Sequence, residues 1–120
     1  MLTKTIFLAS ILAFGSSSGF AEDMSKMDMS KPMGDQSPSS QAFAAANAQM
    51  HKDMGLTYSG NADADFVRGM IAHHQGAIEM AKIELQYGKD PELRKLAKGV
   101  IEAQQKEIKE MEAWLKAHGK

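Results

Sequence analysis

Residues 69–81 read GMIAHHQGAIEMA and predict the middle of a long amphipathic helix. At about 100° per residue, the apolar side chains in and around this stretch fall on one side. This stripe consists of Phe66, Met70, His74, Ala77, Ile78, Ala81 and Leu85. His74 lies near its centre, and His73 lies at its edge beside Met80 and within a turn of Met70. Two adjacent imidazoles flanked by thioethers on one helix predict a site for a soft metal ion.

Apolar residues at three- and four-residue spacing predict three helices in all. They cover residues 41–54, about 61–87, and 91–117. We expect N-caps at Ser39 or Ser40, at Asn61 or Asp63, and at Asp90. The turn before the third helix is short, so the second and third helices should pack antiparallel. The predicted fold class is all-α: an antiparallel helical bundle of one shorter and two long helices.

The N-terminus has the pattern of a secretory signal peptide. Lys4 precedes an apolar run at residues 6–14, and small residues lead to an expected cleavage after Ala21. A retained N-terminal anchor is the alternative. We therefore expect residues 1–21 as signal peptide, residues 22–40 as a disordered Met-rich arm and residues 41–118 as the helical domain. The expected location is the periplasm or the secreted fraction, with no membrane attachment after cleavage.

Composition excludes several classes of site. The 14 basic and 15 acidic side chains give a formal net charge of −1, which offers no electrostatic surface for nucleic acid. The chain has ten methionines and no cysteine, so disulfides and thiolate metal sites are excluded. In an oxidising compartment, thioethers can hold a soft metal where thiols would be liable to oxidation.

The candidate metal ligands lie in three stretches of the chain. The arm contributes Met24, Met27, Met29 and Met33, the first helix Met50, His51 and Met54, and the second helix Met70, His73, His74 and Met80. Thioether sulfur favours Cu(I), while imidazole suits both Cu(I) and Cu(II). The expected ion is copper, with Cu(I) preferred. The alternatives are a compositionally biased linker and methionines that only fill the core.

Two residues of the third helix are expected to support this site. An antiparallel turn near Lys89 places Gln104 opposite His74, and a hydrogen bond between them would explain why both are tolerated in apolar stripes. In that case His74 positions the site rather than binding the ion. The same rule places Met111 near Val67.

Other cofactors fit the sequence less well. Zinc is disfavoured because few carboxylates share these helix faces. A di-iron centre needs Glu-x-x-His pairs, whereas Glu79 and Glu84 are followed at that spacing by Lys82 and Tyr87. No nucleophile arrangement is present, and we do not expect an enzyme. A b-type haem electron carrier and a metal-free helical interaction module, with methionines as an adaptable surface, stay open as alternatives.

Three motifs carry a family resemblance. They are DxDFVRGMIAHHQGAIEMA from Asp63, YGKDPELRKLA from Tyr87 and IEAQQKEIKEMEAWL from Ile101. Together with the MHxxM segment of the first helix, they resemble the CopM-like family of secreted bacterial copper-binding proteins. The resemblance implies a ferritin-like bundle and a periplasmic role in copper tolerance or trafficking. One departure is Ala72, where many relatives carry proline, so a straighter second helix is expected.

The sequence therefore predicts a copper metallochaperone or buffer that acts in copper homeostasis. Its expected partners are copper ions and other periplasmic copper proteins or exporters. Three helices leave one groove poorly covered, and a homodimer that buries the first-helix side is a further expectation.

Overall fold

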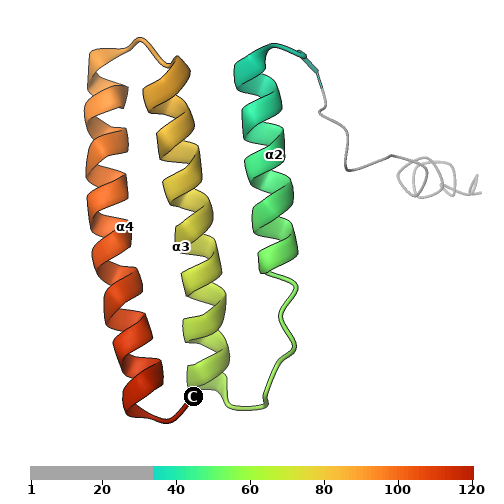
Figure 1. The fold of residues 1–120 in the computed structure, drawn as a ribbon, viewed down its shortest axis with the longest axis vertical. Coiled ribbons are helices and arrows are strands. Elements are labelled where there is room, and N and C mark those ends of the chain that lie inside the picture. The colour runs from blue at the N-terminus through green and yellow to red at the C-terminus, as the bar shows by residue number, and fades with distance from the viewer. Residues whose placement is uncertain (1–33) are drawn as a thin grey trace, which may run out of the picture.

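The computed structural model describes residues 34–120 and contains three α-helices there. Helix α2 spans Pro38–Asp53, α3 spans Ala62–Tyr87 and α4 spans Pro91–Ala117. The helices run antiparallel and lie side by side, with α3 between the other two (Figure 1). Helix α3 contacts both neighbours, whereas within residues 34–120 α2 and α4 do not contact each other. The predicted all-α antiparallel bundle is confirmed, and the bundle is an open one.

The sequence determines where the two long helices begin and end. The side chain of Asn61 accepts a hydrogen bond from the Ala64 N–H, and that of Asp90 accepts from Glu92 and Leu93. Pro91 then occupies the first turn of α4, where its missing N–H costs nothing. The cap predicted at Ser39 or Ser40 is wrong. The N-cap is Ser37, two residues before the first predicted cap, and helix α2 begins at Pro38 because the proline ring pre-sets the helical φ angle there.

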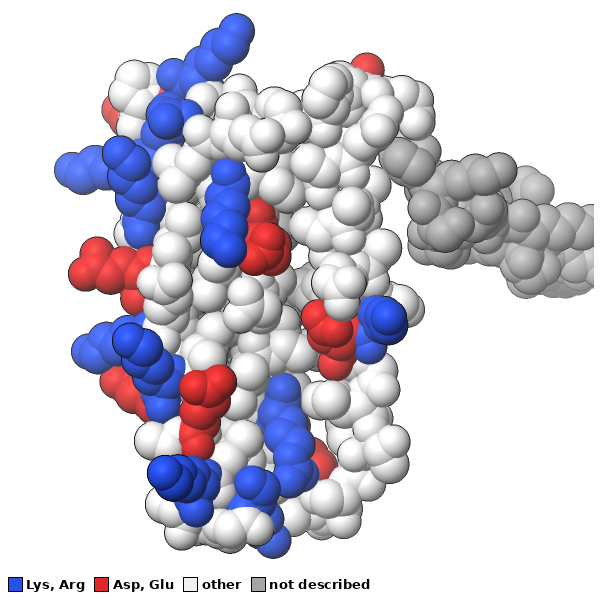
Figure 2. All heavy atoms as spheres, in the orientation of Figure 1, with Lys and Arg blue, Asp and Glu red and all other residues white. Residues whose placement is uncertain are grey.

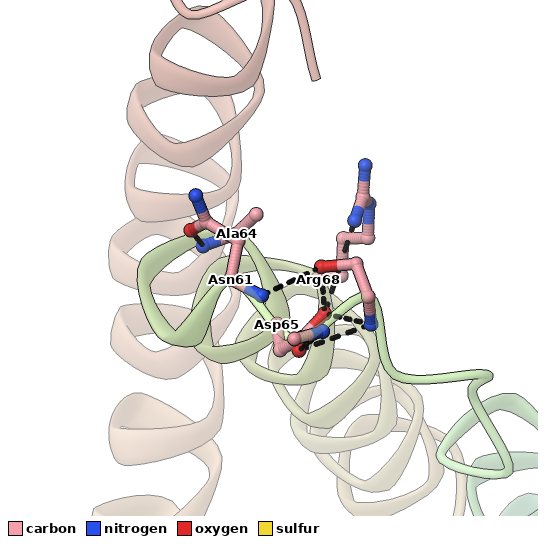
Figure 3. Close-up of polar contacts among 6 residues, drawn as sticks. Asn61, Ala64, Asp65 and Arg68 are labelled. Carbon is pink, nitrogen blue, oxygen red and sulfur yellow. Dashed lines mark hydrogen bonds and ion pairs between the residues drawn. The ribbon is translucent and has the colours of Figure 1, made fainter.

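The loop from α2 to α3 is fastened to the first turn of α3 by Asp65 (Figure 3). Its carboxylate accepts hydrogen bonds from the backbone N–H and hydroxyl of Ser59 and from the N–H of Gly60. These hydrogen bonds hold the pKa of Asp65 below its ordinary value, with the Ser59 N–H as the main cause. Gly60 has a φ of +86°, which favours glycine at this turn.

The core of the described residues is small and lies mainly around α3. Six hydrophobic residues are buried: Ala64, Val67, Ile78, Ala81, Ile83 and Ala97. Helix α2 contributes none of them. Arg94 ties the α3–α4 turn together by donating to the carbonyls of Leu85 and Gly88. Within this part of the chain, none of the helices has the length and apolar character needed to cross a membrane.

The two sides of the α3–α4 pair differ in polarity. One groove between these helices is lined by polar and charged residues that include Gln75, Lys82, Lys109 and Glu112. The other groove is lined by Met80, Leu93, Leu96 and Val100, with three alanines and Glu84. Figure 2 shows charged side chains spread over α3 and along the outer edge of α4. The bundle therefore has a charged face and an apolar face.

Candidate functional site

Met50 of α2 lies directly on Gly76 of α3. A Cβ atom built at Gly76 would lie 2.8 Å from the Met50 Cγ and 3.1 Å from its Cβ, so any larger residue there would force the Met50 side chain to move. Gly76 is buried, and Met50 is half-buried above it. A glycine in a helix interior costs about 1 kcal/mol relative to alanine, and here it lets a thioether approach the α3 backbone.

His73 and Met80 flank this contact on α3. His73 precedes Gly76 by one turn, Met80 follows it by one turn, and both side chains are exposed. The structure thus brings a thioether of α2 to a side of α3 that carries an imidazole and a second thioether. Three of the predicted ligands converge on the same exposed region of the surface.

The other candidates from α2 lie close to this region. With α2 antiparallel to α3, the contact of Met50 with Gly76 places Met54 one turn further along, level with Ala72 and His73. Met54 is at the C-cap of α2 and is 36% exposed. His51 is also exposed and follows Met50 by about 100° around the helix. The first-helix cluster therefore lies at the edge of the same region.

His74 has a different environment from its neighbour. Its Nε2 pairs with the carboxylate of Glu107 on α4, and its side chain is only 14% exposed. The rings of His73 and His74 are 6.4 Å apart at an interplanar angle of 63°. The pair therefore splits, with His74 joining α3 to α4 and His73 on the open surface.

The predicted hydrogen bond between His74 and Gln104 is wrong. Among the described residues, neither the buried Nδ1 of His74 nor the buried Oε1 of Gln104 has a hydrogen-bond partner. Glu107, one turn after Gln104, is the partner instead. Because a carboxylate only accepts, the proton of this bond lies on His74 Nε2. In neutral imidazole, Nδ1 is then left with an unused lone pair.

Two methionines lie level with each other, one turn from the His74–Glu107 pair. The pairing of His74 with Glu107 places Met70, one turn earlier on α3, level with Met111 on α4. Both methionines are half-buried. Met111 therefore lies about one turn from the predicted level of Val67. The partner of His74 differs from the prediction by the same amount.

Ordinary metal clusters do not account for these residues. Within residues 34–120, His, Asp and Glu side chains form no group of three or more that could hold an ion. The predicted arm ligands Met24, Met27, Met29 and Met33, and the signal peptide, lie outside the described residues.

Sequence reasoning did not include two residues of this region. One is Glu107, which lies on the more polar side of the α4 stripe. Only its position three residues beyond Gln104 could have suggested it as the partner of His74. The other is Gly76, whose role in the close approach of Met50 of α2 becomes visible only in the structure.

Residues 12–118 match the family model described as "Domain of unknown function (DUF305)". The chain belongs to this family. Over 53 residues, the DUF305 chain is 43% identical to "Uncharacterized protein L153" of Acanthamoeba polyphaga mimivirus. That alignment covers 44% of this chain and 35% of the viral protein. DUF305 membership thus spans the three helices described above.

Proposed function

We propose that this protein binds Cu(I) as a cargo ion outside the cytoplasm, as a metallochaperone or buffer. The observation that carries the proposal is the seat of Met50 on Gly76, between His73 and Met80. These groups are soft or borderline donors, and they lie at the surface, where an ion can be received and passed on by ligand exchange.

The remaining support comes from the sequence. The absence of cysteine and the methionines of the arm suit capture of a soft ion in an oxidising compartment. The HHQGAIEMA motif resembles the CopM-like family of secreted copper-binding proteins. Delivery to other periplasmic copper proteins or exporters is part of the proposal.

An anaerobic competition titration against a coloured Cu(I) chelator tests this function. The full mature chain should bind Cu(I) more tightly than a scrambled peptide of the same methionine content. Replacing His73 by alanine or Met50 by leucine should weaken binding at least tenfold, because each substitution removes a donor atom while keeping the helix. Gln75→Ala is the matched control, since Gln75 lies on the charged groove of the same helix, away from the candidate ligands, and its loss should leave the affinity unchanged.

The contribution of the Met-rich arm is tested by a separate variant. A chain in which Met24, Met27, Met29 and Met33 are all serine should bind fewer Cu(I) ions per chain but keep the site on α3. Wild-type protein that binds no more tightly than the scrambled peptide would refute copper binding altogether.

A further inference from the structure

One stripe of residues runs along the open side of α3, between the sides that pack against α2 and α4. Its members are separated alternately by four and three residues, the spacing of a coiled-coil seam. They are Phe66, Met70, His73, Ala77, Met80 and Glu84. Phe66 is 65% exposed and Met80 is 51% exposed. The stripe therefore has the pattern of a helix-packing surface, yet Phe66, His73 and Met80 in it are exposed.

The apolar face extends from this stripe onto the neighbouring helices. Leu93 and Leu96 of α4 are 52% and 62% exposed and line the apolar groove with Met80. Together with Phe66, Phe43, Met54 and Tyr87, these side chains expose on the order of 600 Å² of mainly apolar surface, which approaches the roughly 800 Å² that each partner buries in a stable interface.

The spacing of the stripe is symmetric about a point midway between His73 and Ala77. Met70 and Met80 lie three residues outside this gap, and Phe66 and Glu84 lie four residues further out. An identical α3 running antiparallel would therefore match it layer for layer. The symmetry centre falls at residue 75, the middle of Ala62–Tyr87, so the two helices would overlap almost completely.

Charge does not oppose this pairing. Glu84 is the stripe's one acidic residue, and its carboxylate lies over the backbone of Gly88 rather than across the face. Helices that lie on membranes carry an excess of lysine or arginine beside their apolar face, whereas the edge of this face beside Leu96 carries both Glu92 and Lys95. Both facts favour a protein surface, and the symmetric spacing favours a second copy of this chain.

Within one chain, His73 lies one helical turn from Met70 but two turns from Met80. His73 and Met80 are seven residues apart, about 10.5 Å along the helix axis, whereas Met70 and His73 are about 4.5 Å apart along it, so an ion at His73 is closer to Met70 than to Met80 of the same chain. In the antiparallel pair, Met80 of the second copy faces Met70, one turn from His73. Two thioethers and an imidazole would then meet at each of two equivalent positions.

We propose that the apolar face is an antiparallel homodimer interface and that each metal site is shared between two copies. Met70 and His73, with Met50 of α2 beside them, come from one chain, and Met80 comes from the other. The shared site rests on the proposed copper function, whereas the dimer itself does not. The two parts are therefore tested separately.

Sedimentation equilibrium of the metal-free mature chain tests the interface. The wild-type protein should have the mass of a dimer, and Leu96→Glu should shift it to a monomer with unchanged helical circular dichroism. Gln75→Glu, on the charged groove of the same helix pair, is the matched control and should stay dimeric. A wild-type monomer at several hundred micromolar, or a Leu96→Glu protein as dimeric as the control, would overturn the interface.

A mixed dimer tests the shared site. His73→Ala and Met80→Leu chains are expressed together with different tags, and the heterodimer is isolated by both tags. Each homodimer should lose the tight Cu(I) site, whereas the heterodimer should regain one site per dimer, because one intact set of Met70, His73 and the second copy's Met80 is restored. A heterodimer as weak as the homodimers would show that the ligands do not come from two chains.

These outcomes separate the two proposals. A dimer that binds no Cu(I) in its wild-type form would refute the copper function and the shared site while leaving the interface standing. A monomer that binds Cu(I) tightly would refute the interface and the sharing while leaving the copper function standing.

Discussion

The two interfaces of α3 are built differently. Against α4, α3 buries branched side chains such as Val67 and Ile78 and adds the His74–Glu107 pair. Against α2, the contact is made at Gly76. Helix α2 contributes half-buried alanines and Met50 to this interface but no buried residue. Buried apolar area is the main source of stability, so α3 and α4 should form the stable unit and α2 the weakly attached one.

This difference bears on the proposed function because Met50, a proposed ligand, lies on the weakly attached helix. If an ion binds Met50 together with groups of α3, ion binding favours the docked position of α2. An apo protein in which α2 opens more readily would release or accept the ion more easily. The stability of the α2–α3 interface therefore bears directly on ligand exchange.

The largest effect is expected from Ile78→Ala. Ile78 is 2% exposed, and removing its side chain from the core should cost about 2–4 kcal/mol of unfolding free energy. Phe43→Ala on α2 is the comparison. Phe43 is already 38% exposed, so its truncation should cost about 1 kcal/mol despite the larger side chain. Urea unfolding followed by circular dichroism measures both, and equal losses would show that the two interfaces are equally strong.

Gly76→Val is expected to act on α2 alone. A side chain at Gly76 would overlap Met50, and overpacking of this kind costs about 1–3 kcal/mol. Hydrogen exchange should show lost protection in α2 and unchanged protection in α4. Gly69→Ala is the control, because a Cβ there has nothing within 4 Å and should stabilise α3 by about 1 kcal/mol. Equal loss of protection in α2 and α4 would contradict the weak attachment of α2.

Much of this arrangement could be predicted from the sequence, because helix signals are local. Asn61, Gly88 and Asp90-Pro91 mark helix ends by their own chemistry, and the predicted ends there are confirmed. The start of α2 was missed because Pro38 can either end a loop or begin a helix. Interactions between helices were harder. The partner of His74 was displaced by one turn, since the geometry of the α3–α4 turn sets the register and sequence distance gives it only approximately.

The open shape of the bundle could not be derived from the sequence either. All three helices have apolar stripes, and such stripes are compatible with a closed three-helix core. Only coordinates show that α2 and α4 stay apart within the described residues and that Phe66, Leu93 and Leu96 remain exposed. The candidate ligands were found by their chemistry, but the division between His73 and His74 depends on this packing.

Glu107→Gln should have a smaller effect on the α3–α4 interface. Glu107 is 52% exposed, so solvent weakens its pairing with His74, and its loss should cost about 0.5–1 kcal/mol. Glu110→Gln is the matched control. Its ion pair with Lys106 spans 4.0 Å between largely exposed side chains, so the urea midpoint should hardly move. If the two variants unfold at the same midpoint, the pair contributes nothing to holding α4 against α3.

The smallest effect is expected where the loop from α2 joins α3. The pKa of Asp65 is lowered in the folded protein chiefly by the Ser59 N–H, so its ionised form contributes stability that is fully present above the unfolded-state pKa. That contribution is lost as the pH falls through the folded-state pKa. Asp65→Asn should therefore lower the urea midpoint slightly at pH 7, and the difference from wild type should shrink well below about pH 4. Carbon-detected NMR titration of the Asp65 carboxyl measures the pKa directly. An ordinary value there, or a stability difference that is the same at both pH values, would mean that the carboxylate does not fasten the loop to α3.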